Sequence, residues 1–179
     1  MSQQVIKVSL EDFLRTGVFG PVEFGMTGDE ILSFFGPPDS VFTRRKSHRP
    51  TGFEYGDVEF YFMNAKDNRL YAIYLDHFDV PTGSGLLSLD AWRLRGAMSQ
   101  ADVEAALTEA NISFQPTEMP DPSMDGVVTA AGVSLGFIRE DEEFSPPAGL
   151  YNIYRDVRAQ MEVESSERLP PNNSFDPFI

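Results

Sequence analysis

The 179-residue chain contains no cysteine, only two histidines and a single tryptophan. The absence of cysteine excludes disulfide bonds and thiolate metal sites. Two histidines are also few for a zinc site, which needs several converging ligands. No stretch approaches the roughly 20 apolar residues of a membrane span, and the N-terminus has no apolar run of signal-peptide length. We therefore expect a cytoplasmic protein without a metal or other cofactor.

Positive charge is scarce. Lys and Arg number 14 against 28 Asp and Glu, which gives a net charge of −14. Residues 90–156 hold 12 acids and 4 Arg, a net −8. Such a field repels phosphate backbones and argues against nucleic-acid binding. It attracts a basic protein partner, although solubility alone is a sufficient reason for an acidic surface.

An internal repeat organises the middle of the chain. Leu-Tyr-Ala-Ile-Tyr-Leu-Asp at 70–76 corresponds to Leu-Tyr-Asn-Ile-Tyr-Arg-Asp at 150–156, with five of seven positions identical. Upstream of each copy lies a helix start. Thr27-x-x-Glu30 is a capping box, and Ser99 with Asp102 is its weaker counterpart. The turn glycines Gly56 and Gly132 each separate two strand-like segments. The three matching segments therefore follow one another in the same order in both copies.

The pattern predicts an α+β fold of two tandem repeats, each a helix followed by a four-stranded antiparallel meander. One continuous curved sheet is a natural arrangement of these strands. The first repeat spans 20–80, with strands at 39–45, 51–55, 57–63 and 69–76. The second spans 91–156, with strands at 112–118, 126–131, 133–138 and 149–156. A helical lead-in (1–19), a connector (81–90) and an extended tail (157–179) complete the chain. We expect Ile73 and Ile153 to be buried.

No catalytic signature is present. The chain lacks a Gly-x-Ser-x-Gly elbow, a phosphate loop and a dinucleotide fingerprint. His48 lies in a basic loop at 44–49, and His77 follows a strand; neither has the neighbours of a metal site. We therefore assign no catalytic or metal-binding residue and expect a non-enzyme.

Binding residues are predicted from exposed acids and aromatics. Asp57, Glu59 and Tyr61 belong to one strand, where alternate residues share a face, and Trp92 lies at the junction of the repeats. The run Glu140, Asp141, Glu142 and Glu143 forms an acidic loop. A solvated sheet face and a solvated loop are the simpler interpretations. The basic loop at 44–49 can pair with the acidic surface of a second copy, so monomer and homodimer both stay open.

The pattern Gly25-Met26-Thr27-x-x-Glu30-Ile31, followed by Gly36-x-Pro38, resembles the helix opening of beta-lactamase-inhibitor-protein-like domains and of small outer-membrane assembly lipoproteins. In the inhibitor family two such units stand in tandem and their strands form one curved sheet. Size, acidity and the segment Phe-Gly-Pro-Val-Glu-Phe-Gly-Met at 19–26 also resemble immunity proteins of bacterial polymorphic toxin systems.

These resemblances imply a protein that binds and inhibits another protein. The expected function is non-enzymatic inhibition of a basic partner, as an immunity protein that neutralises a toxin. The alternative is a small ligand-binding domain or a hydrolase with a site between the two repeats.

Overall fold

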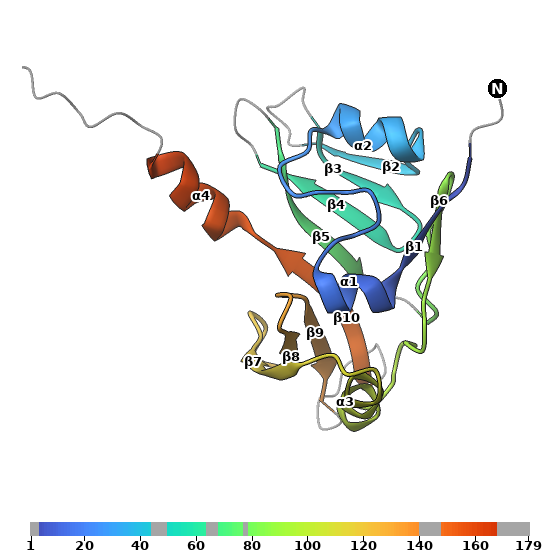
Figure 1. The fold of residues 1–179 in the computed structure, drawn as a ribbon, viewed down its shortest axis with the longest axis vertical. Helices are drawn as coiled ribbons and strands as arrows, with labels where there is room; N and C mark the ends of the chain where they lie inside the picture. The colour runs from blue at the N-terminus through green and yellow to red at the C-terminus, as the bar shows by residue number, and fades with distance from the viewer. Residues whose placement is uncertain (1–3, 44–49, 64–67, 77–78, 140–147, 168–179) are drawn as a thin grey trace, which may run out of the picture.

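The computed structural model describes residues 4–43, 50–63, 68–76, 79–139 and 148–167. It has an α+β fold with one eight-stranded antiparallel sheet, in the order β2-β3-β4-β5-β10-β9-β8-β7, and a parallel pair, β1-β6 (Figure 1). The large sheet consists of β2 (Ser40–Thr43), β3 (Pro50–Tyr55), β4 (Val58–Phe62), β5 (Leu70–Asp76), β7 (Phe114–Glu118), β8 (Met124–Thr129), β9 (Ser134–Ile138) and β10 (Gly149–Asp156). The other elements are β1 (Ile6–Ser9), β6 (Leu87–Asp90), α1 (Leu10–Thr16), α2 (Gly28–Phe35), α3 (Gln100–Glu109) and α4 (Arg158–Glu167). Within these ranges, no helix has the length and apolar character needed to cross a membrane.

The helices begin where the sequence predicts them. Thr27 and Glu30 form a complete capping box at the start of α2: the Thr27 hydroxyl accepts from the Glu30 backbone N–H, and the Glu30 carboxylate accepts from the Thr27 backbone N–H at 2.7 Å. The Ser99 hydroxyl accepts from the Asp102 backbone N–H at the start of α3. Asn111 follows α3 in the left-handed conformation, with φ 54°, as expected for a residue that ends a helix.

Both groups of four strands run as meanders. The helix α2 precedes β2 to β5, and α3 precedes β7 to β10. The two groups meet in the middle of the sheet, where β5 pairs antiparallel with β10 over five residues of each strand. The large sheet is therefore continuous across both groups, and its outer strands are β2 and β7.

The core lies on one face of the large sheet. In Figure 1, α1 and α2 lie in front of the sheet, with β1 and β6 to their right and α3 below. Phe35 of α2 stacks on Phe60 of β4 with ring centroids 5.9 Å apart, and Phe19, which follows α1, meets the same ring edge-on at 5.8 Å. Ile73 and Ile153 are both fully buried in this core, as predicted.

Two segments differ from the prediction. The connector contains β6, because Leu87 is buried and the backbone of 87–90 pairs in parallel with β1. The tail, expected to be extended, begins with the helix α4. Asp156 accepts the backbone N–H of Arg158 at 2.8 Å, which satisfies one of the free donors at a helix start. Ala159, Gln160 and Met161 then favour a helix by their propensity.

We predict that Ile73→Ala and Ile153→Ala each lower the free energy of unfolding by about 2–5 kcal/mol, because each leaves a cavity in a packed core. Urea denaturation measures this loss directly. Val41→Ala is the matched control, since Val41 is 52% exposed and a surface change of this kind costs about 0.5 kcal/mol or less. Losses no larger than that of the control at both isoleucines would contradict the prediction.

Candidate binding surface

The second face of the large sheet carries aromatic and acidic side chains. We call it the open face and define it by the residues of β2 to β5 and β10 that alternate with the buried core residues. Its members are Ser40, Phe42, Gly52, Glu54, Glu59, Tyr61, Ala72, Tyr74, Asp76, Asn152, Tyr154 and Asp156. Four of these are carboxylates, and none is Lys or Arg. The aromatic members are half-buried, whereas the residues between them along β4, such as Phe60, are fully buried.

The strand register arranges these side chains in rows across the sheet. In one row, Glu54 pairs with Glu59, Glu59 with Tyr74, and Tyr74 with Tyr154. The rings of Tyr74 and Tyr154 are stacked across the β5–β10 boundary, with centroids 4.8 Å apart and an interplanar angle of 3°. The stacked pair therefore lies at the centre of the sheet, where the two groups of strands join.

A second row depends on the absence of a side chain at Gly52. Phe42 pairs with Gly52, and Gly52 with Tyr61. Because Gly52 has no Cβ, the Phe42 ring crosses it and stacks on Tyr61 at 5.7 Å. A Cβ at Gly52 would lie 2.6 Å from Phe42 Cδ2, so any other residue would displace the ring. Tyr61 in turn meets Tyr74 edge-on at 5.5 Å, which connects the two rows.

The hydroxyls of Tyr61 and Tyr74 keep their protons at higher pH than an ordinary tyrosine, because both pKa values are raised. Burial raises the pKa of Tyr74 to about 12, and Asp156 adds to this effect. Burial also raises the pKa of Tyr61 well above its usual value, and its hydrogen bond to Glu59 raises it further. That hydroxyl donates to Glu59 Oε2 at 2.5 Å. At neutral pH the open face thus presents neutral phenols beside carboxylates.

The first turn of α4 lies at the rim of the open face. The Arg158 guanidinium lies 4.2 Å from the centroid of the Tyr71 ring. Arg158, Tyr71 and Tyr61, together with Thr51, Phe62, Met63 and Glu162, line a cleft of about 370 Å³. An arginine side chain of the protein itself thus already rests on a tyrosine of β5.

The predicted binding residues do not all come together. Glu59 and Tyr61 lie on the open face as expected. Asp57 does not share that face, because it precedes β4 in a turn and its carboxylate accepts from the backbone N–H and the hydroxyl of Thr82, at 2.7 and 2.8 Å. Trp92 lies beyond β6 with φ 54°, and its half-buried ring packs against the core. The prediction that Asp57 shares a strand face with Glu59 was therefore wrong, because β4 begins at Val58. A role of Asp57 or Trp92 in binding a partner stays a prediction.

Other predicted residues lie outside the described part of the chain. These are Glu140, Asp141, Glu142 and Glu143, the basic loop at 44–49 with His48, and His77. Their roles stay predictions.

Of the twelve members of the open face, the sequence prediction assigned only Glu59 and Tyr61 to a binding surface. The unassigned members include Phe42, Glu54, Tyr74, Tyr154 and Asp156. The repeat contained a signal for two of them. Tyr74 and Tyr154 each follow a buried isoleucine directly, so alternation along a strand places them on the opposite face. The contact of Phe42 with Tyr61 depends on Gly52 and on strand order, which no local pattern reveals.

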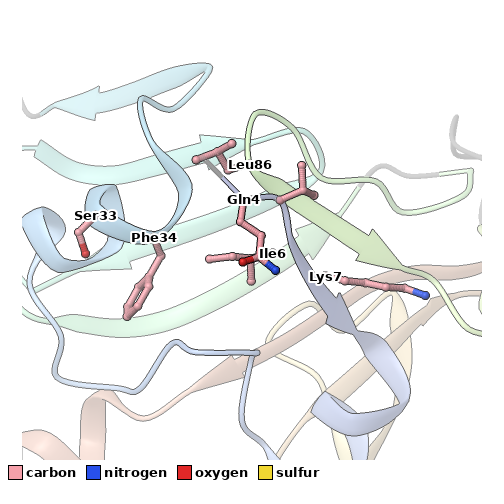
Figure 2. Close-up of a pocket in the computed structure, with 7 residues that line it drawn as sticks. Gln4, Ile6, Lys7, Ser33, Phe34 and Leu86 are labelled. Carbon is pink, nitrogen blue, oxygen red and sulfur yellow. The ribbon is translucent and has the colours of Figure 1, made fainter. Parts of the chain in front are cut away.

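Other clefts lie away from the open face. Figure 2 shows one of about 500 Å³ between β1 and α2, with Phe34, Ile6 and Leu86 on its walls. Another, of about 410 Å³, lies between the start of α3 and the neighbouring ends of β8, β9 and β10. In the part of the chain that the structure describes, His, Asp and Glu side chains form no group of three that could hold a metal ion.

The raised tyrosine pKa values predict how stability depends on pH. A group that binds its proton more tightly in the folded state contributes stability that is complete below its unfolded pKa and is lost above it. We therefore expect the contribution of Tyr74 to be full below pH 10 and to disappear as pH rises to about 12. Urea denaturation across this range should show a steeper loss for the wild type than for Tyr74→Phe, which has no phenol to ionise at this position. An equal loss of unfolding free energy with pH in the two proteins would contradict the prediction that the raised pKa of Tyr74 contributes to stability.

Comparisons with known proteins give little further information. No family model matches the chain, and no curated protein matches it. Among solved structures, the chain is similar to the crystal structure of a DUF4309 family protein, YjgB, from Bacillus subtilis. The alignment has a TM-score of 0.37 and 13% identity, and it covers 73% of this chain and 78% of that chain. So distant a likeness carries no inference about function.

Proposed function

We propose that this chain is a non-enzymatic inhibitory protein that binds a basic protein partner, in the manner of an immunity protein that neutralises a toxin. The open face is the proposed contact surface. The observation that carries the proposal is the combination of a connected set of aromatic rings with four carboxylates, and no Lys or Arg, on one face of five adjacent strands.

The aromatic rings suit a protein interface. Tyr is enriched in interfaces because it buries a large area and keeps a polar tip. Phe42, Tyr61, Tyr74 and Tyr154 each contact another ring of this group, so their conformations are restricted before a partner arrives. Binding would then cost less side-chain entropy than it would for flexible residues.

The carboxylates suit a basic partner. A protein with a net charge of −14 attracts cationic molecules over a distance set by salt screening. Acids on the contact surface add specificity and a faster encounter, whereas the buried rings supply most of the affinity. Removing acids should therefore change mainly the association rate, and removing rings should change mainly the dissociation rate.

We also propose that the two helix-plus-meander units arose by duplication. Support comes from the matching caps Thr27 and Ser99, from the same order of one helix and four strands in each unit, and from the central position of β5 and β10. Under this proposal the stacked tyrosines are equivalent residues, one from each copy. Duplication would also account for the width of the sheet, which a single four-stranded unit would not offer.

The test compares two variants of equal net charge. Glu54→Gln/Asp156→Asn removes two acids from the open face, and Asn keeps the ability to cap α4. Glu23→Gln/Glu118→Gln removes two exposed acids elsewhere. Each tagged protein is used to capture partners from the native host, and captured partners are produced in cells with and without this protein.

We expect the wild type and the Glu23/Glu118 control to capture the same basic protein and to suppress its toxicity. The open-face variant should associate with it more slowly, by roughly tenfold at low salt, with a small change in dissociation. Equal association rates for the two double variants would contradict the proposed surface. Capture of a non-toxic partner, or of none, would contradict the proposed inhibitory function.

A further inference from the structure

We infer that the open face selects arginine over lysine, and that its occupant is an exposed, arginine-bearing segment of the basic partner. This inference rests on the proposed function and specifies the chemistry of that partner. The contact centres on Tyr154, with Asp156 beside it.

The position of Tyr154 leaves one side of its ring for a ligand. Tyr74 stacks against one face of the ring, so the other face is turned toward β9, where the paired residue is Ser134. Beyond Ser134 the row continues with Val128, and both are small side chains. A flat group that approaches the Tyr154 ring along this row meets only these two small side chains, whereas Met119 and Met124 lie over Gly136 in the neighbouring row of Asn152.

Hydrogen-bond acceptors flank the same ring. Asp156 and Asn152 lie two residues after and before Tyr154, and so on the same face of β10. The Asp156 side chain is exposed. The Asn152 amide oxygen is buried and has no hydrogen-bond partner among the described residues. A buried acceptor without a donor is costly. The ends of Met119 and Met124 lie beside this oxygen above Gly136, so a ligand N–H group reaches it only when these flexible side chains move, whereas Asp156 is accessible without such a movement.

Arginine fits these features better than lysine does. The guanidinium group is planar and weakly hydrated, stacks on aromatic faces and donates two parallel hydrogen bonds to one carboxylate. The lysine ammonium is compact and strongly hydrated, so it gains less from a ring face. Both groups feel the same net charge, and any preference between them must therefore come from the ring and its neighbouring acceptors.

The protein already contains this kind of contact. Arg158 lies over Tyr71 at the rim of the open face at 4.2 Å, and Arg155 lies over Phe24 on the core side at 5.0 Å. In both cases a guanidinium group covers the face of an aromatic ring. The inferred contact repeats this arrangement with an arginine from the partner.

The experiment uses the full chain and two blocked peptides, hexa-arginine and hexa-lysine, which have the same length and charge. Isothermal titration at matched salt gives both dissociation constants. We expect hexa-arginine to bind roughly three- to thirtyfold more tightly, the range expected for a cation–π contact. Tyr154→Leu should bring the ratio close to one, and Tyr154→Phe should preserve it because the ring remains. Phe34→Leu, which alters a half-buried aromatic residue on the helix-covered side, should leave the ratio unchanged.

The outcomes separate the inference from the proposed function. Equal binding of the two peptides, weakened alike by Glu54→Gln/Asp156→Asn, would overturn the arginine preference and leave the acidic contact surface intact. A preference that survives in Tyr154→Leu would overturn the assignment to this ring. Binding of neither peptide would overturn the inference, while the capture experiment decides the proposed function separately. Sedimentation of the wild type without peptide tests a second copy as occupant, and a dimer that Asp156→Asn dissociates would also overturn the inference.

Discussion

The pairing of β5 with β10 is the constraint on which the rest of this structure depends. Without it, each group of four strands would expose an unpaired edge, with backbone donors and acceptors left to water or to another chain. The antiparallel register places Leu75 beside Ile153 on the core side and Tyr74 beside Tyr154 on the other. One set of backbone hydrogen bonds therefore aligns both the core and the candidate surface, and a slip by one residue would exchange the two faces.

Arg155 ties the same boundary to the N-terminal helix. It pairs with Ile73 on the core side of β10, where a charged residue is unexpected. Its guanidinium donates to the Gly17 carbonyl at 2.6 Å, at the end of α1, and lies over the Phe24 ring. Burial lowers its pKa, but the guanidinium group stays charged because its ordinary pKa is so high. The hydrogen bond and the ring offset part of the loss of hydration, so α1 and the following loop are held against the centre of the sheet.

Local patterns in the sequence were sufficient for the helix starts and for most strands. Caps act within one turn, and alternation acts within one strand, so Thr27, Ser99 and Ile73 could be placed without knowledge of the fold. The strand β6 was not predicted, because its pairing partner, β1, lies some 80 residues earlier in the chain. Most residues of the open face were not predicted for the same reason. Neighbours such as Phe42 and Tyr61, or Tyr74 and Tyr154, are set by strand order, and strand order depends on contacts distant in sequence. Asp57 is an error of a different kind. It was predicted to lie in a strand, but it belongs to the turn that precedes β4.

The fold alone accounts for the tyrosines of the open face more readily than for its acids. Aromatic residues favour strands, and cross-strand aromatic pairs stabilise a sheet by about 0.2–1 kcal/mol. Tyr74 and Tyr154 would thus be good choices even on a surface that binds nothing. Glu54 and Glu59 are different, because acidic residues are depleted in strands and like charges on directly paired residues destabilise the sheet. A Lys or Thr at position 54 would serve the fold better. The fold gives Glu59 one role, because its carboxylate accepts the Tyr61 hydroxyl. The direct pairing of Glu54 with Glu59 is therefore the feature that the proposed cationic partner would explain and that the aromatic rings do not require.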